Sequence, residues 1–278
     1  MQKKFLGCHL TKNNIVTAMK IRLSVLFMAV AFVVVFSTFV GIQSFAAVGM
    51  SNEVNDEEAP IAETTIAVEE TQPESAATKN PVILCHGFIG GYGLTPWGVM
   101  KDRLVRDGWN RNQIFEIYYK DPVFASNVQN AQELAAYVQY VLKVTGASKV
   151  DLIGHSMGGL STRYYIKFLG GVNYVDDYVS LGSPHHGTLL ADIPLLPLLS
   201  AGAIEMRPGS AFMNKLNSGD ETPGSVSYTS IYSYIDELVF PYWTCKLSGA
   251  ANKGCWSEHV YLVFHSDAYR WTRDAIIN

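Results

Sequence analysis

The most constraining feature of this 278-residue chain is a short motif near its middle, Gly154-His155-Ser156-Met157-Gly158-Gly159. The apolar run before it, residues 149–153, is predicted to be a buried strand, and residues 160–169 after it are predicted to form a helix that ends at a glycine pair. Gly-x-Ser-x-Gly between a strand and a helix is typical of a nucleophile elbow, a sharp turn that exposes the serine hydroxyl. The N–H groups at the start of the helix favour developing negative charge there. The motif therefore predicts a catalytic serine, Ser156, with an ordinary glycine-rich turn as the alternative.

From residue 81 onward, predicted strands and helices alternate along the chain. Predicted strands cover residues 81–85, 113–119, 149–153, 177–181 and 226–233, and predicted helices cover residues 97–107, 128–145, 160–169 and 266–277. This alternation predicts the α/β class, a mostly parallel sheet with helices on both faces. Ligands bind at the carboxyl ends of the strands in such sheets, which is where Ser156 falls.

The first eighty residues have a different composition. Residues 23–40 are almost entirely apolar, follow Lys20 and Arg22, and lead to the small-residue site Ser44-Phe45-Ala46. They predict a signal peptide over residues 1–46, with Met19 as an alternative start and cleavage after Ala46. A retained membrane anchor is the alternative, because the apolar run is long for a signal peptide.

Residues 47–80 carry eight acidic residues and one basic residue. A segment with so little apolar surface is predicted to be a disordered acidic linker or a propeptide. Residues 81–278 then form the catalytic domain. We expect this domain to be secreted, with no membrane span left after cleavage of the signal peptide.

A serine nucleophile needs a histidine base and an orienting acid, which follow a nucleophile elbow in the order acid, then histidine. His259, in the loop before the last helix, is the predicted base. Asp236 is the predicted acid, because it comes just after the strand at residues 226–233, and its neighbour Glu237 is expected to point elsewhere. The alternatives for the base are the other histidines downstream of the serine, His185, His186 and His265.

Two backbone N–H groups should hold the oxyanion. One belongs to the residue after the serine, Met157, and the other to Phe88 in the glycine-rich loop after the first strand. Residues 189–199 are rich in leucine and contain two prolines, so they form either an apolar flap over the site or a loop packed on the core. The residues predicted to contact substrate are Ile89, His155, Leu189 and Leu195.

Charge, short motifs and cysteine positions bear on which partners, metals and cross-links the domain can have. Residues 81–278 carry 17 acidic and 15 basic residues with no basic stripe, so no nucleic-acid partner is expected. Neither Cys-x-x-Cys nor His-Glu-x-x-His occurs, so no metal is expected. Cys245 and Cys255 lie ten residues apart in a glycine-rich segment, and in a secreted protein they are predicted to form a disulfide.

Several segments resemble one family. Residues 82–88 and the elbow motif are similar to the secreted bacterial triacylglycerol lipases of class 2, in particular the small Bacillus-type lipases. Residues 228–233 (Tyr-Thr-Ser-Ile-Tyr-Ser) and 258–260 (Glu-His-Val) resemble the acid and histidine segments of that family, and residues 181–188 resemble a segment of its larger members. The resemblance implies an α/β-hydrolase fold, ester hydrolysis without a cofactor, and Ser156, Asp236 and His259 as the triad. Unlike the small lipases, the chain has a long segment at residues 183–223 and a cysteine pair.

The sequence thus predicts a secreted serine ester hydrolase, a triacylglycerol lipase that acts on a lipid or other ester at a lipid–water interface. A short-chain carboxylesterase, a phospholipase or a thioesterase is the alternative within the same class. A relative without catalytic activity that binds lipid or a partner is the alternative outside it.

Overall fold

The computed structural model of the chain describes residues 79–88, 90, 97–192 and 200–277. These residues belong to one compact unit, Glu74–Asn278, and the other unit, Met1–Pro73, lies outside the described ranges. The predicted signal peptide and nearly all of the predicted acidic linker also lie outside the described residues.

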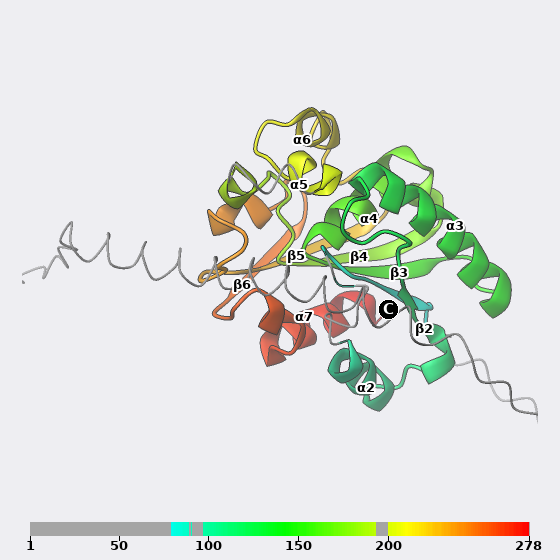
Figure 1. Cartoon of the computed structure of the whole chain (residues 1–278). Coiled ribbons are helices and arrows are strands. Elements are labelled where there is room, and N and C mark those ends of the chain that lie inside the picture. The colour runs from blue at the N-terminus through cyan, green and yellow to red at the C-terminus, as the bar shows by residue number, and fades with distance from the viewer. Residues whose placement is uncertain (1–78, 89, 91–96, 193–199, 278) are drawn as a thin grey trace, which may run out of the picture. The chain divides into compact units, whose positions relative to one another are not determined.

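The core is a six-stranded sheet in which each neighbouring pair of strands is parallel (Figure 1). Across the sheet the order is β2-β1-β3-β4-β5-β6. The strands are β1 (Val82–Cys85), β2 (Ile114–Ile117), β3 (Val150–His155), β4 (Val175–Leu181), β5 (Ser227–Ser233) and β6 (Ala251–Cys255). Strands β1 and β3 are buried over their whole length, as strands in a sheet covered on both faces must be. The predicted α/β class is confirmed.

Helices cover both faces of this sheet. Figure 1 shows α3 and α4 on one side and α2 and α7 on the other. Alternate residues of a strand point to opposite faces, so Ile83 packs in the cluster with α3 and α4, and Leu84 packs in the cluster with α2 and α7. The helices are α2 (Gly98–Arg106), α3 (Asn127–Thr145), α4 (Met157–Phe168), α5 (Ala201–Glu205), α6 (Ala211–Leu216) and α7 (Ser266–Ile276). Within the described ranges, none of the helices is long and apolar enough to cross a bilayer.

The longest helix, α3, has clear sequence signals at both ends. Ser126 and Gln129 form a reciprocal capping box, and Gly146 ends the helix in the left-handed conformation. The face at Leu134 and Val138 is fully buried against the sheet. Burial of each such side chain contributes roughly 1.5–3 kcal/mol, so this helix anchors one layer of the fold.

Strand β6 was not expected from the sequence, and it bears on the predicted disulfide. The sulfur atoms of Cys245 and Cys255 are not bonded, and both thiols are free and buried, so the disulfide prediction is wrong. Cys255 pairs in register with Ser233 and packs in the same cluster as Ile231. Cys245 packs with Tyr232, whose side chain leaves β5 on the opposite face. The sheet itself separates the two sulfur atoms.

The long segment at residues 183–223 packs over α4. It contains α5, α6 and the short 3-10 turn η4 (Leu189–Asp192), while residues 193–199 lie outside the described ranges. Phe212 stacks on Tyr164 of α4 with ring centroids 5.7 Å apart. Most of the leucine-rich segment, predicted as either a flap or a packed loop, therefore lies outside the described residues, but both flanks dock on the domain. The other short turns are η2 (Arg111–Gln113), η3 (Gly171–Asn173), η6 (Tyr242–Cys245) and η7 (Val260–Val263).

Candidate active site

Ser156 stands at the junction of β3 and α4 in a strained conformation. Its φ is 56° and its ψ is −131°, and among the described residues it is the only non-glycine residue with a positive φ. Such a conformation costs of order 1–3 kcal/mol and persists only where the surroundings impose it. The serine is half-buried and stands in the sharp strand-to-helix turn that the motif predicts.

The glycines of the motif are required by close contacts. A Cβ atom on Gly158 would lie 2.4 Å from the carbonyl oxygen of His86, and one on Gly154 would lie 2.6 Å from the Cα of Gly159. Both distances are impossible for a real side chain, so only glycine lets the strand, the turn and the helix approach this closely.

His259 and Asp236 form a buried hydrogen-bonded pair. His259 Nδ1 lies 2.8 Å from Asp236 Oδ2 and 3.0 Å from Oδ1. The backbone N–H groups of Leu238 and Val239 also donate to Asp236 Oδ1, at 2.9 and 2.7 Å. A carboxylate accepts only, so Nδ1 carries the proton and Nε2 is left as an acceptor.

The end of β4 joins this pair to the serine. The N–H of Ser156 donates to the carbonyl oxygen of Leu181, at 2.8 Å. A Cβ atom on the next residue, Gly182, would lie 3.2 Å from both Asp236 Oδ2 and His259 Cε1. The serine and the histidine–aspartate pair therefore flank the same two residues, as predicted from the meeting of strand ends.

The charges around His259 favour its protonated form. Burial alone would lower the pKa of His259, but the carboxylate of Asp236, its hydrogen bond and the carboxylate of Glu237 together raise it above the usual value of 6.5. An imidazolium at this place is thus stabilised, which is what a base needs once it has taken a proton.

The loop that carries the predicted oxyanion donor Phe88 lies beside the serine. A Cβ atom on Gly87, the residue before Phe88, would lie 2.7 Å from Ser156 Cβ and 3.2 Å from the N atom of Met157. The loop after β1 therefore packs directly on the elbow. As the first residue of α4, Met157 has an N–H group without a partner inside the helix. The arrangement brings the loop that carries Phe88 next to the N–H of Met157.

The four residues predicted to contact substrate have different outcomes. His155 is buried, and its Nε2 lies 3.1 Å from the carbonyl oxygen of His259, so it faces the base from within the protein. Leu189 is 49% exposed, and its N–H donates to the carbonyl oxygen of Phe240. Ile89 and Leu195 lie outside the described residues.

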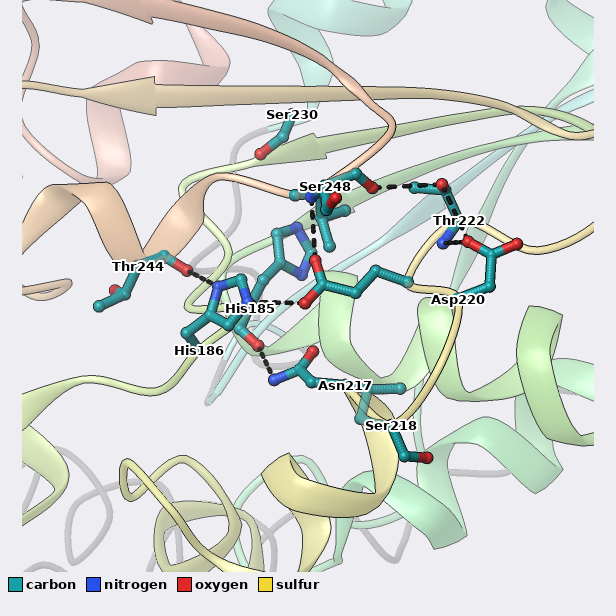
Figure 2. Close-up of polar contacts among 12 residues, drawn as sticks. His185, His186, Asn217, Ser218, Asp220, Thr222, Ser230, Thr244 and Ser248 are labelled. Carbon is teal, nitrogen blue, oxygen red and sulfur yellow. Dashed lines mark hydrogen bonds and ion pairs between the residues drawn. The ribbon is translucent and has the colours of Figure 1, made fainter.

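The alternative histidines have other partners. His185 is fully buried and lies 2.9 Å from the hydroxyl of Ser180. The ring of His186 contacts the carbonyl oxygen of Thr244 and a carboxylate oxygen of Glu221 (Figure 2). His265 precedes α7 and accepts the first backbone bond of that helix. Of the four histidines downstream of the serine, all of them within the described ranges, only His259 bonds to Asp236.

One contact at the site departs from the sequence prediction. Glu237 was expected to point elsewhere, yet its Oε2 accepts the backbone N–H of His259 at 2.9 Å. The sequence signal for this residue is only its position beside Asp236, which does not say where its side chain points.

Three acidic side chains lie close enough together to share a metal ion, but at the other end of the sheet. The carboxylate oxygens of Asp151, Asp176 and Asp177 are within 4.8 Å of one another, the one such group in the described ranges. Lys149 pairs with Asp176 at 2.6 Å. Burial and then the charge of Asp177 raise the pKa of Asp151 to about 8, so this carboxyl holds a proton near neutral pH. The group is remote from Ser156.

Comparison with known proteins agrees with this geometry. The family described as "Lipase (class 2)" matches residues 79–273. A triacylglycerol lipase of Pseudarthrobacter phenanthrenivorans is 36% identical over 127 residues, which cover 42% of this chain and 37% of that lipase. A triacylglycerol lipase of Vibrio cholerae is 28% identical over 210 residues, covering 72% of this chain and 64% of that lipase.

Among solved structures, lipase B of Aspergillus fumigatus superposes with a TM-score of 0.61 at 21% identity, covering 72% of this chain and 53% of that one. At that identity the likeness shows the α/β-hydrolase fold. The matches span less than two thirds of the length of the curated relatives.

Proposed function

The chain belongs to the class 2 lipase family, and from this membership and the geometry of the site we propose that it hydrolyses triacylglycerols through an acyl-enzyme on Ser156. One observation carries the proposal. A strained, half-buried serine on a nucleophile elbow and a buried His259–Asp236 pair flank the end of the same strand. This is the arrangement that serine acyl transfer requires.

Each residue of the site has its own role in the proposed reaction. His259 Nε2 takes the proton of the Ser156 hydroxyl while the serine oxygen attacks the ester carbonyl. The N–H groups of Phe88 and Met157 hold the oxyanion of the tetrahedral intermediate. His259 then gives its proton to the leaving alcohol, and a water molecule, activated in the same way, releases the fatty acid. Asp236 stays ionised and stabilises the imidazolium.

The test is a Ser156→Ala variant assayed on tributyrin and on triolein. We expect kcat to fall by about 10⁶-fold, with an unchanged unfolding temperature because the side chain is small and half-buried. A fluorophosphonate should label the unmodified protein on Ser156 and leave the variant unlabelled. Labelling elsewhere, or activity that survives the substitution, would refute the role of Ser156.

The elbow does not discriminate a lipase from a carboxylesterase for soluble esters. Rates measured on either side of the concentration at which tributyrin forms droplets separate the two. A rate that rises when droplets appear, with turnover of triolein, supports the lipase. A hyperbolic rate on the dissolved ester alone, without turnover of triolein, makes the protein an esterase.

Exposed aromatic side chains around the catalytic loops favour action at a lipid surface. Trp243, Tyr242, Tyr234 and Trp256 form a continuous chain of rings whose successive centroids are 5.4, 5.3 and 5.1 Å apart. We call these four residues the aromatic rim. Its tryptophans are 58% and 69% exposed, and it lies in the segments that carry Asp236 and His259. Exposed apolar patches of this kind mark interaction surfaces.

The rim can be tested apart from the chemistry. Trp243→Ala combined with Trp256→Ala should lower hydrolysis of emulsified triolein several-fold and leave hydrolysis of a dissolved butyrate ester unchanged. Tyr140→Ala is the matched control, because Tyr140 is 54% exposed but lies on α3. Equal effects of the two changes on emulsified substrate would contradict interface binding by the rim.

We also propose that the protein is exported. Residues 1–46 have the basic start, the apolar run and the small-residue site of a signal peptide, and the acidic segment at residues 47–80 then joins the exported domain. Amino-terminal sequencing of protein recovered from the medium of a secreting bacterial host should begin at Ala47. Recovery of the full chain from the membrane fraction would favour the retained anchor.

A further inference from the structure

The proposed base lies in an irregular loop. Residues 256–258 form neither helix nor strand, and His259 precedes only the short turn η7. A catalytic group must nevertheless be held to within about 0.5 Å of its working position. Contacts from outside the loop therefore decide how well His259 is oriented.

Side chains from two other parts of the chain bind both backbone polar groups of His259. Its N–H donates to Glu237 Oε2 at 2.9 Å, from the loop after β5. Its carbonyl oxygen lies 3.1 Å from Nε2 of His155, at the end of β3. We propose that Glu237 and His155 are positioning residues for His259, and that the charge of Glu237 also sets the pH range in which His259 acts as a base. The inference rests on the proposed function.

His155 is suited to this role because it is neutral. A carbonyl oxygen only accepts, so His155 must carry its proton on Nε2. Burial first, and then the neighbouring His259, lower the pKa of His155 to about 3. Its ring lies against that of His259 with centroids 4.8 Å apart, and it makes an edge-to-face contact with Trp97 at 6.4 Å. His155 can therefore orient the base without placing a second positive charge beside the imidazolium.

Glu237 acts on His259 in two ways. Its carboxylate holds the N–H group, and its charge is one of the causes that raise the pKa of His259. The titratable groups that face His259 are Asp236 and Glu237 from the loop after β5 and His155 from β3. Because His155 is neutral, the carboxylates of Asp236 and Glu237 determine the electrostatic field at the His259 imidazole.

The chain offers a matched control for Glu237. Glu258 is the immediate neighbour of His259, and both Glu237 and Glu258 are exposed, but in the described structure only Glu237 binds the histidine. Glu237→Gln keeps an oxygen acceptor and removes the charge, Glu237→Ala removes both, and Glu258→Gln removes a charge that makes no bond to the histidine.

The experiment is the pH profile of kcat and KM for a dissolved butyrate ester, with the unfolding temperature of each variant. We expect Glu237→Gln to move the acid limb of kcat/KM to lower pH while kcat on the plateau stays within about twofold. Glu237→Ala should also lower the plateau kcat by roughly 3- to 10-fold, the effect of losing one hydrogen bond of ordinary strength, since the Glu237 side chain is exposed to solvent, with KM unchanged. Glu258→Gln should change neither kcat nor the acid limb.

His155 is tested by the pair His155→Gln and His155→Phe. Glutamine keeps a donor at the end of a side chain of similar reach, whereas phenylalanine keeps the ring and loses the donor. We expect His155→Phe to lower kcat by roughly 3- to 10-fold without moving the acid limb, and His155→Gln to restore most of it. His155 is buried, so His155→Phe can fail to fold; in that case the proposal is tested by the variants of the exposed Glu237.

The outcomes separate the inference from the function on which it rests. If the unmodified protein does not hydrolyse the ester, or does so without Ser156, the proposed function fails. If it hydrolyses the ester through Ser156 but the acid limb and kcat of both Glu237 variants match those of Glu258→Gln, the positioning inference fails and the proposed function stands. The positioning inference also fails if Glu237→Ala and Glu258→Gln lower kcat equally.

Discussion

The described residues include two histidine–carboxylate pairs of nearly equal length in very different surroundings. His259 Nδ1 lies 2.8 Å from Asp236, with the two side chains 2% and 0% exposed. His186 Nε2 lies 2.9 Å from Glu221, with the two side chains 40% and 14% exposed. Distance alone would give both pairs the same role. Burial distinguishes them, because charges interact more strongly where water is excluded.

The partners of the second pair show that it joins segments of the fold. Glu221 also accepts the backbone N–H of Ser248, and Thr222 donates to the carbonyl oxygen of Ser248 (Figure 2). From α4, the buried side chain of Arg163 donates to backbone carbonyl oxygens of Leu216 and Glu221. The His186–Glu221 pair thus belongs to a polar seam that joins the segment at residues 183–223 to η6, to the loop before β6 and to α4.

The largest expected difference between the pairs is in turnover. Asp236→Asn should lower kcat by roughly 10⁴-fold, because the amide no longer holds the tautomer of His259 that leaves Nε2 free to accept a proton. Glu221→Gln should leave kcat within about twofold. Steady-state kinetics on a dissolved ester checks both, with circular dichroism to show that each variant is folded. Comparable losses in the two variants would mean that the seam is part of the catalytic machinery.

The second expected difference is in the pH dependence of activity. Only neutral His259 can act as a base, and its pKa is raised above 6.5 by Asp236 and Glu237 against the lowering effect of burial. Activity should therefore fall as the pH drops, with half-maximal kcat/KM above pH 6.5. His186→Gln should leave this acid limb in place. The measurement is kcat/KM across pH 5 to 9. If His186→Gln moves the acid limb, the titration belongs to His186 and the prediction is wrong.

The smallest expected difference is in stability. Burial alone would raise the pKa of Glu221, but the Ser248 N–H, the hydrogen bond and charge of His186, and Arg163 lower it below 4.5. A carboxyl with a lowered pKa stabilises the folded state above its unfolded pKa and loses that contribution as the pH falls through the folded value. Because the pair is partly exposed, its contribution should be about 1 kcal/mol or less, or roughly 2–4 °C.

Thermal unfolding of Glu221→Gln at several pH values measures this contribution. The variant should be less stable than the unmodified protein at pH 7, and the gap should narrow below pH 4.5. A gap that widens below pH 4.5 would show that Glu221 is not stabilised as a carboxylate.

The sequence was sufficient for the parts of the fold that repeat a simple pattern. Short apolar runs, interrupted in β3 by Asp151, identified β1 and β3, and strand-end logic placed His259 beside Asp236. The strand Ala251–Cys255 was missed because four of its five residues are exposed or half-buried and include Asn, Lys and Gly, which gives no apolar pattern. The spacing of two cysteines did not reveal that they lie on opposite faces. Nor could the sequence show that Glu237 turns back to His259, because loop side chains follow no period. The catalytic roles themselves remain predictions for the kinetics to test.

The separation of Cys245 from Cys255 also affects how the protein folds and how it reacts with oxidants. Since no covalent cross-link joins these segments, the domain should reach its native state in a reducing cytoplasm as readily as in an oxidising medium, and dithiothreitol should not lower its unfolding temperature. Burial, and then the nearby Asp267, raise the pKa of the Cys255 thiol to about 11, and burial raises that of Cys85 to about 12. Thiolate is the form that oxidants and alkylating reagents attack. These two buried cysteines should therefore react only slowly with oxidants and alkylating reagents.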